Sequence, residues 1–237
     1  MTVTLMHSSD IHVEDDVTGL GHTGLPGLRA VIDTARGVAA DVLLLAGDTF
    51  DNHRVSAPVL NAAVALIGGA GLPVVLLPGN HDPVLPDCMF RRTGLADMAH
   101  VRIFGVTHDD RIVLEEHSLE ILGRAHRGFG DMPPLPAPRP RAAHWQVVVA
   151  HGHYVPPHEW QAQSHRAWRI GDDDLAAMQA DYIALGHWDR AEPAGDGRVP
   201  AFYSGSPDLA QSVNLVRLDE TDGVSVTRQS LQSQQQR

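Results

Sequence analysis

The chain has 237 residues, of which 43% are hydrophobic and 20% charged, a composition typical of a soluble globular protein. The formal net charge of −11 at pH 7 argues against a protein whose main role is to wrap nucleic acid, because phosphate binding normally needs a basic surface. All 18 basic residues are arginine and there is one cysteine, so lysine Schiff bases, internal disulfides and thiolate metal clusters are excluded. No apolar run has the length of a membrane span and no signal peptide is recognisable, which predicts a cytoplasmic protein without a membrane partner.

The first 80 residues predict alternating strands and helices. Strands are expected at residues 3–6, 42–46 and 73–77, and helices at 25–40 and 57–67. Both helical segments have apolar periodicity and a proline in the first turn, and Ser56 is expected to cap the second helix. This β-α-β-α-β order predicts parallel strands joined by helical crossovers.

Shorter strands are expected after residue 82, at 101–104, 111–114, 119–122, 146–150, 182–185 and 201–204, with a helix at 172–180. Two further strands, 213–218 and 224–228, are expected to form a hairpin. Residues 131–144 contain five prolines and have the composition of a linker. We interpret them as an internal loop, because candidate ligands on both sides must converge. The expected organisation is therefore one domain, residues 1–237, without a separate capping domain.

Five predicted strands end in clusters of metal-capable side chains. The clusters are Asp10-Ile11-His12, Gly47-Asp48-Thr49-Phe50-Asp51, Gly79-Asn80-His81-Asp82, Ala150-His151-Gly152-His153 and Gly186-His187-Trp188-Asp189. One such cluster has little significance, because a lone Gly-Asn-His-Asp is more often a turn. Ligands bind at the carboxyl ends of strands in open α/β sheets, so five clusters in succession predict one shared site.

The ligand types indicate which metals fit this site. Carboxylate, imidazole and amide oxygen without thiolate favour manganese, iron or zinc over a closed structural zinc site. Two ions satisfy this many ligands more easily than one, and Asp48 at the end of the central strand is the natural bridge. Paired ions about 3.5–4 Å apart can generate a hydroxide nucleophile and hold a phosphoryl group, which predicts phosphoester hydrolysis.

The order of these motifs, Asp-x-His, Gly-Asp-x-x-Asp, Gly-Asn-His-Asp, His and Gly-His-x-x, resembles the calcineurin-like metallophosphoesterases from about Leu5 to Pro207. The stretches LLLAGDTFDNHRVS, LPVVLLPGNHDP, DYIALGH and FYSGSPDL look most like the SbcD-type DNA repair exonuclease branch. The resemblance implies an α/β fold of four layers, α/β/β/α, in which two mixed sheets are flanked by helices.

The resemblance also implies roles for individual residues. The first metal would be held by Asp10, His12 and Asp48, and the second by Asp48, Asn80, His151 and His187. His81 would protonate the leaving oxygen, and Asp82 would orient the ring of His81. Manganese is the preferred ion, with iron or zinc as alternatives. Asp51 is expected to fix its loop rather than to bind a metal.

The last motif departs from the family pattern, because Asp189 stands where a histidine usually binds the first metal. Three alternatives are open: direct ligation, ligation through a water, and a weak first site. Direct or water-mediated ligation is favoured over no role. His153 is interpreted as solvent-facing, and His53 is offset by one position from a family histidine. The remaining candidates, His22, His126, His158 and His165, are expected at the surface.

The leading hypothesis is a two-metal phosphoesterase acting on a phosphodiester or phosphomonoester, with nucleotides and nucleic acids among the candidate substrates. One alternative is a DNA nuclease subunit working with a partner ATPase, which the acidic charge and the lack of a capping domain weaken. The other is a scaffold or binding module with an altered metal site. His81 and six of the seven expected ligand residues are present, which argues against a scaffold.

Overall fold

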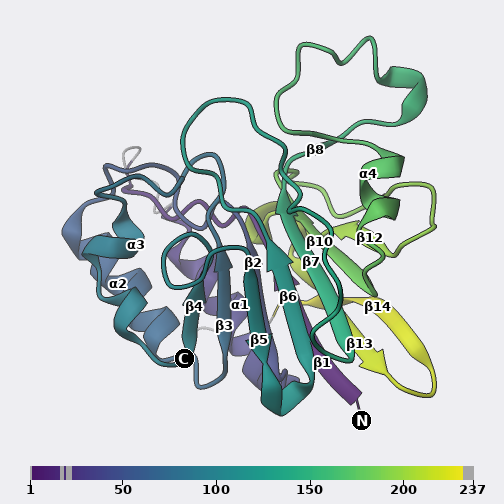
Figure 1. Ribbon diagram of the computed structural model, residues 1–237. Coiled ribbons are helices and arrows are strands. Elements are labelled where there is room, and N and C mark those ends of the chain that lie inside the picture. Colours follow the sequence, from purple (N-terminus) through teal and green to yellow (C-terminus); the bar gives the residue numbers. More distant parts are fainter. Residues whose placement is uncertain (1, 17–18, 20–22, 232–237) are drawn as a thin grey trace.

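The computed structural model describes residues 2–16, 19 and 23–231, which form two large mixed sheets with helices outside them (Figure 1). The first sheet has the order β14-β13-β1-β2-β3-β4. Its strands are β1 (Thr2–Ser8), β2 (Val42–Ala46), β3 (Val74–Leu77), β4 (Val101–Ile103), β13 (Ser212–Asp219) and β14 (Gly223–Ser230). The second sheet, ordered β11-β12-β10-β7-β6-β5, contains β5 (Arg111–Leu114), β6 (Leu119–Gly123), β7 (Trp145–His151), β10 (Tyr182–Gly186), β11 (Pro193–Ala194) and β12 (Ala201–Tyr203).

The helices are α1 (Leu25–Gly37), α2 (Ala57–Gly68), α3 (Met89–Arg92), α4 (Asp172–Ala177) and α5 (Pro207–Ala210). Short 3₁₀ turns, η1 (Leu95–Asp97), η2 (Glu115–His117) and η3 (Pro157–Glu159), and a two-stranded pair, β8 (His153–Tyr154) with β9 (Arg169–Ile170), complete the fold. Strands β1, β2 and β3 are parallel, so the predicted β-α-β-α-β order is confirmed. The predicted terminal hairpin is confirmed as β13 paired antiparallel with β14.

Two helices are shorter than predicted, for the same reason. The first ends at Gly37 instead of residue 40, and α4 ends at Ala177 instead of residue 180. Shortly after each end stands a residue with positive φ, Ala39 at 51° and Gln179 at 51°. A left-handed residue cannot continue a right-handed helix, and neither position carries the glycine that would have indicated the end.

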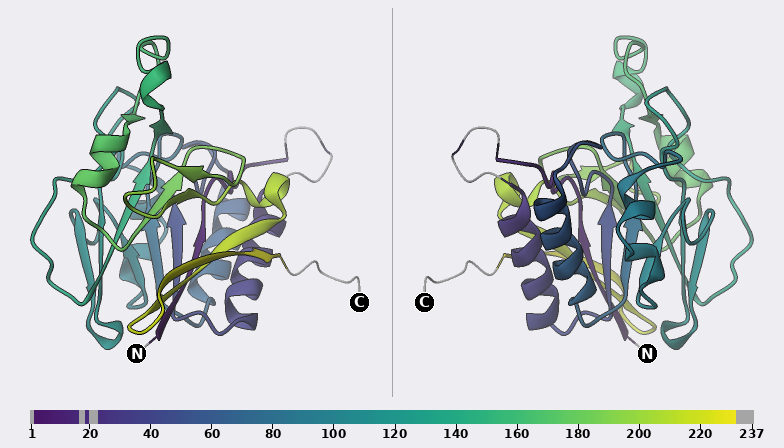
Figure 2. Two further views of the ribbon diagram at one scale, coloured as in Figure 1. Left: turned by 90° about the vertical axis from the view of Figure 1, so that its right-hand side faces the viewer. Right: turned by 90° about the vertical axis from the view of Figure 1, so that its left-hand side faces the viewer.

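The layers follow from side-chain alternation along the strands. In β7, Val147 and Val149 enter the core between the two sheets, whereas Val148 and Ala150 enter a second core under Leu175 of α4. Both faces of the strand are therefore buried. On the opposite side, α1 and α2 cover the outer face of the first sheet (Figure 2). The observed order is α/β/β/α, as the resemblance implies.

The packing of α1 on the first sheet follows from the spacing of its apolar residues. Its buried apolar residues Leu28, Val31, Ile32 and Ala35 follow the i, i+3, i+4, i+7 spacing of one helical face. Ser56 precedes α2 but does not cap it, because its hydroxyl donates to the carboxylate of Asp15 instead of accepting from the helix.

The topology brings the candidate ligands to one rim. Strands β1, β2 and β3 are parallel in one sheet, and β6, β7 and β10 are parallel in the other. Residues 131–144 connect β6 to its neighbour β7, so the proline-rich segment is an internal loop, as predicted. No helix within the described part of the chain is long and apolar enough to cross a membrane.

Candidate metal centre

Four of the predicted ligands have a backbone conformation that residues with side chains rarely adopt. Their φ angles are 54° at Asp10, 50° at His12, 50° at Asp48 and 104° at His187. Each such residue costs on the order of 1–3 kcal/mol and persists only where the surroundings hold it. Here the main chain supplies the hold, because the amides of Asp10 and His12 donate to the carbonyls of Gly47 and Asp48, both at 3.1 Å.

Glycine precedes two of the ligands because neighbouring chain comes too close for a side chain. A Cβ atom at Gly47 would lie 2.0 Å from Nδ1 of His151. One at Gly186 would lie 1.9 Å from the carbonyl oxygen of Ala46. Both separations are far below van der Waals contact, so the Gly-Asp and Gly-His motifs are packing requirements of this rim.

The residues predicted for the second metal converge closely. Nε2 of His151 lies 3.0 Å from Oδ2 of Asp48 and 3.0 Å from Oδ1 of Asn80, and Nδ1 of His187 lies 3.1 Å from the same Asn80 oxygen. Neighbouring ligands of a six-coordinate ion with bonds of about 2.1 Å are separated by about 3 Å. The donor atoms therefore have the spacing of one coordination sphere.

The hydrogen bonds of His151 decide which way its lone pair points. Nδ1 lies 2.9 Å from the carbonyl oxygen of Ala46, which can only accept, so Nδ1 carries the hydrogen. In the neutral ring, Nε2 then turns its lone pair toward the oxygens of Asp48 and Asn80. Three acceptors facing one another are stabilised by a cation, either a proton on His151 or a metal ion among them. The donor set therefore fits a metal.

The charges around this cluster support the same conclusion. Burial alone would lower the pKa of His151, but the charge of Asp48 and the hydrogen bond to it raise that pKa to about 9. Burial would raise the pKa of Asp48, yet His151 holds it well below its usual range. Burial and the charge of His151 lower the pKa of His187 to about 3, so His187 is the neutral histidine of the group.

The described residues contain two potential metal clusters, and they share Asp48. One consists of Asp48, His151 and His187, and the other of His12, Asp48 and His81, with all ligand atoms of each cluster within 4.8 Å of one another. Asp48 thus lies where a bridging carboxylate is predicted. Asp10 is in neither cluster: it is buried, and its carboxylate accepts the His187 amide at 3.0 and 3.1 Å. Burial raises the pKa of Asp10 to about 6.

Asp189 belongs to neither cluster of the described chain. Its side chain is exposed and lines a neighbouring pocket with His187, a predicted second-metal ligand, and with His153 and Glu192. Its carbonyl oxygen accepts the amide of Ser206 at 3.0 Å, which fixes the backbone. The structure therefore places Asp189 on one pocket with His187 but outside both clusters.

The ring of His81 is oriented by Asp51 and not by Asp82. Nδ1 of His81 lies 2.8 Å from the carbonyl oxygen of Asp51 and 3.3 Å from its Oδ1. The predicted partner, Asp82, is fully buried and accepts the amides of Phe50 at 3.0 Å and Gly79 at 2.7 Å. Both of its carboxylate oxygens therefore accept main-chain amides and join two loops, which corrects the predicted role of Asp82 as the partner of His81.

Asp51 also contacts a second histidine. Its Oδ1 lies 3.2 Å from Nδ1 of His12, and the rings of His12 and His81 meet edge to face with centroids 4.8 Å apart. The Asp51 amide donates to the carbonyl of Val13 at 3.0 Å. Asp51 thus joins its loop to Val13 through the main chain, and its side chain also contacts two candidate site histidines.

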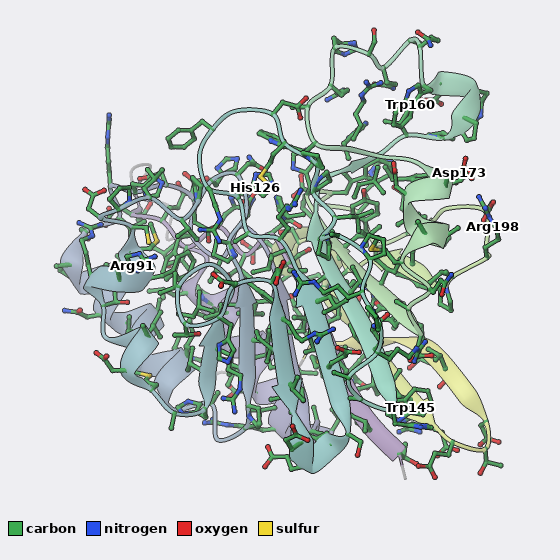
Figure 3. The ribbon with its side chains drawn as sticks, in the orientation of Figure 1. Arg91, His126, Trp145, Trp160, Asp173 and Arg198 are labelled. Atoms are coloured by element: carbon green, nitrogen blue, oxygen red, sulfur yellow. The ribbon has the colours of Figure 1, made fainter. Side chains whose placement is uncertain are left out.

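Two histidines differ from their predicted surface positions. His126 is fully buried; its Nε2 lies 2.8 Å from the carbonyl oxygen of His151, and it lies above the carboxyl end of β6 (Figure 3). Burial lowers its pKa to about 4. His153 is half-buried, and its Nδ1 accepts the indole N–H of Trp188 at 2.9 Å. His158 and His165 are exposed as predicted, and His22 lies outside the described residues.

A cavity of about 960 Å³ opens beside the clusters. Its lining comprises Glu14, Asp15, Asp51, Asn52, His53, Arg54, Asn80, His81, Leu85, Asp87, Arg92, Phe129 and Trp168. Its volume is that of a small-molecule site. Sequence reasoning missed Phe129 and Trp168, because both lie in irregular segments without a motif. A Gly-Phe-Gly triplet was the only available signal.

The sequence pattern that describes the calcineurin-like phosphoesterases matches residues 3–190. Among solved structures, the chain is similar to the protein TT1561 of Thermus thermophilus, with 12% identity, a TM-score of 0.57, and 96% of this chain and 99% of that chain covered. It is also similar to a putative 5'-nucleotidase from Staphylococcus aureus in complex with alpha-ketoglutarate, with 14% identity and a TM-score of 0.57. That match covers 98% of this chain and 54% of the other. At these identities the likeness shows the fold alone. No curated protein gives a significant match.

Proposed function

The chain belongs to the calcineurin-like phosphoesterase family, and from this premise we propose that it is a two-metal-dependent phosphoesterase with His81 as general acid. Its substrate is a phosphodiester or phosphomonoester. The observation that carries the proposal is the orientation of His151, whose Nδ1 is committed to Ala46 and whose Nε2 faces the oxygens of Asp48 and Asn80.

The second ion would be held by Asp48, Asn80, His151 and His187, and the first by Asp48 and His12 with Asp10 beside them. Two divalent ions bound there, with manganese preferred and iron or zinc as alternatives, would activate a water for attack at phosphorus and neutralise charge on the phosphoryl oxygens. The protein fixes the orientation of its ligands beforehand, through the Ala46 carbonyl and through the strained loops tied to each other.

His81 has the geometry of a proton donor. Because the Asp51 carbonyl can only accept, Nδ1 of His81 carries a hydrogen, which leaves Nε2 for the leaving oxygen. Burial would lower the pKa of His81, but Asp48 and Asp51 raise it above its ordinary value. Both residues thereby favour the imidazolium form, which is the form that a general acid needs.

Asp51 acts as a positioning residue in this proposal. Its carbonyl fixes the tautomer of His81, and its carboxylate accepts from the ring of His12. The carboxylate of Asp82 instead ties the loop after β2 to the loop after β3. A scaffold would have no need of a proton donor held in this way, so this arrangement favours catalysis over the scaffold hypothesis.

The test combines metal analysis with two leaving groups. The protein loaded with manganese should hydrolyse bis(p-nitrophenyl) phosphate and a dialkyl phosphodiester. The variant His81→Ala should retain its metal and lose about 10²–10⁴-fold in kcat on the alkyl ester, the range of general acid catalysis. Its loss on the p-nitrophenyl ester should be smaller, because p-nitrophenolate leaves without a proton.

The matched control is His158→Ala, which removes an exposed histidine that belongs to neither potential metal cluster of the described residues and does not line the cavity. Equal losses of His81→Ala on both esters would refute the acid assignment. Absence of turnover on phosphomonoesters and phosphodiesters with manganese, iron and zinc would refute the phosphoesterase itself and favour the scaffold. Degradation of linear DNA with a steep salt dependence would favour the nuclease alternative.

A further inference from the structure

We propose that the cavity beside the metal centre binds the base of a small nucleoside phosphate against the ring of Phe129, with Trp168 as the wall toward the metal ligands. This inference rests on the proposed phosphoesterase function and names its substrate class. Phe129, Trp168, Asn80 and His81 line the same cavity, so an aromatic group and a phosphate of one molecule can be held together there.

The first observation is the exposure of Phe129. Its side chain is 65% exposed, and among the described residues only Leu209 is a second large apolar side chain of this kind. The ring of His53 meets it edge to face, with centroids 5.8 Å apart and planes at 86°. Such a contact covers the ring only in part and leaves apolar surface available for a planar ligand.

The second observation is that the loop carrying Phe129 is anchored to the metal centre. The Nε2–H of the buried His126 donates to the carbonyl of His151, and the His126 amide donates to the carbonyl of Pro78 at 3.2 Å. The amide of Val84 donates to His126 in turn, at 2.7 Å. Phe129 lies three residues after His126 in the chain. The loop that carries it therefore starts from a residue that is fixed beside the candidate ligands.

Trp168 supplies the third observation. Its φ of 54° is a strained value for a bulky residue, and strain of this kind is concentrated at functional sites. The strain is held by its amide, which donates to Oδ1 of Asp131 at 2.7 Å, and by its indole N–H, which donates to the carbonyl of Gly130 at 3.0 Å. Its ring centroid is 5.7 Å from that of His187, a metal-ligand candidate.

These bonds join two loops around the cavity. Residues 130 and 131 immediately follow Phe129, so Trp168 and Phe129 are held on one connected wall. The ring of Trp168 also packs edge to face on His126, with centroids 5.1 Å apart. Trp168 is thus held by two hydrogen bonds and by its ring contact with His126. Phe129, in contrast, is flanked by Gly128 and Gly130, where an added Cβ would meet nothing within 4 Å. Phe129 therefore has room to adjust to a ligand.

The polar lining favours a nucleotide over a lipid-like ester. Four carboxylates, those of Glu14, Asp15, Asp51 and Asp87, line the cavity, and an aliphatic chain buried among them would remove water from their charges without offering a hydrogen-bond donor. Ribose hydroxyls can donate to carboxylates. A nucleoside phosphate therefore matches both the aromatic and the acidic part of the lining.

The same charges favour a mononucleotide over a nucleic acid strand. Arg54 and Arg92 are the two arginines of the cavity lining, against the four carboxylates. Proteins that bind single strands combine aromatic rings with a positively charged track along the backbone, and this lining supplies the aromatic part without the track. The cavity volume of about 960 Å³ is also of small-molecule size.

The test compares substrates that share their phosphate chemistry and differ in the base. Adenosine 5'-monophosphate is paired with ribose 5-phosphate, and adenosine 2',3'-cyclic phosphate with glycerol 1,2-cyclic phosphate. The manganese-loaded protein should prefer the base-bearing member of each pair in kcat/KM. The variant Phe129→Ala should raise KM for that member by roughly 5–100-fold, the value of base stacking, without changing turnover of the base-free member. Phe129→Trp should restore the preference.

Leu209→Ala is the matched control, because it removes the second large exposed apolar side chain of the described residues, in α5, outside this cavity. An unchanged preference in Phe129→Ala, or equal use of both members by the parent, would overturn the inference while leaving the phosphoesterase intact. A higher kcat/KM for a single-stranded oligonucleotide than for the mononucleotide would overturn the mononucleotide assignment.

Titration calorimetry with adenosine and with ribose gives a readout independent of turnover. Adenosine should bind the parent and Leu209→Ala alike, and bind Phe129→Ala more weakly by the same factor as the change in KM. If no ester is turned over but adenosine binds in this pattern, the phosphoesterase proposal fails and the base site stands. Absence of adenosine binding to the parent would overturn the base site.

Discussion

Nδ1 of His151, at the end of β7, lies 2.9 Å from the carbonyl oxygen of Ala46, at the end of β2. This hydrogen bond crosses from one sheet to the other. The candidate ligands are divided in the same way, since Asp48 and Asn80 follow strands of the first sheet, whereas His151 ends β7 and His187 follows β10 of the second. An ion bound among them would therefore join the two halves of the sandwich.

We expect removal of metal to destabilise the fold as a consequence. A ligand that binds only the folded state at 100 times its Kd adds about 2.7 kcal/mol to the free energy of unfolding. The free energies of unfolding from thermal melts with manganese and after chelation should differ by about this amount. Asp48→Asn, which weakens the shared ligand, should reduce the difference, and the exposed-site variant His158→Ala should keep it. An identical melting temperature with and without metal would contradict binding at this rim.

The fold was predictable from the sequence to a large extent, because runs such as Val42–Ala46 are local signals for buried strands and parallel strands place their ends on one rim. What could not be predicted depends on conformation that no local pattern reports. The left-handed backbone of Ala39 ends a helix without a glycine. His126 is buried by contacts from distant loops, although Arg124 and Arg127 stand close to it in the sequence. The choice between Asp51 and Asp82 as partner of His81 depends on side-chain direction.

Asp189→Ala is expected to leave the second metal site unaffected. The side chain is exposed and belongs to neither cluster, whereas Nδ1 of His187 lies 3.1 Å from the oxygen of Asn80. Metal analysis should show that His187→Ala loses an ion while Asp189→Ala retains the parental number. Loss of one ion from Asp189→Ala would instead support the direct or water-mediated ligation that the sequence suggests.

His7 should make the protein sensitive to mild acid. It is fully buried in β1, with Nδ1 2.8 Å from the hydroxyl of Tyr182, and burial, aided by the charge of Arg228, lowers its pKa to about 3. Between that value and the ordinary pKa of about 6.5 the unfolded chain binds the extra proton, so stability falls as the pH falls below 6.5. Relative to His7→Gln, the parent should lose about 2 kcal/mol between pH 7 and pH 5. Denaturant titrations at both pH values measure this difference, and parallel losses in the two proteins would contradict it.

Asp51→Asn and Asp82→Asn should have separate effects on activity and stability. The Asp51 carboxylate raises the pKa of His81 and lies on the cavity, so its neutralisation should lower that pKa and move the alkaline limb of the kcat/KM profile to lower pH. The Nδ1 contact of His81 to the main-chain carbonyl remains, so the loss of kcat at the new optimum should be small.

Asp82 is fully buried and accepts two amides, and burial together with the charge of Asp48 raises its pKa to about 7. Replacing one of its acceptor oxygens by an amide group leaves a donor facing a donor, at a cost of about 1–3 kcal/mol in unfolding free energy. The charge of Asp82 also raises the pKa of His81, but less than that of Asp51 does. Asp82→Asn should therefore melt lower than the parent with a small displacement of the pH limb, and Asp51→Asn should melt like the parent with a larger displacement. A larger displacement in Asp82→Asn than in Asp51→Asn would return the orienting role to Asp82.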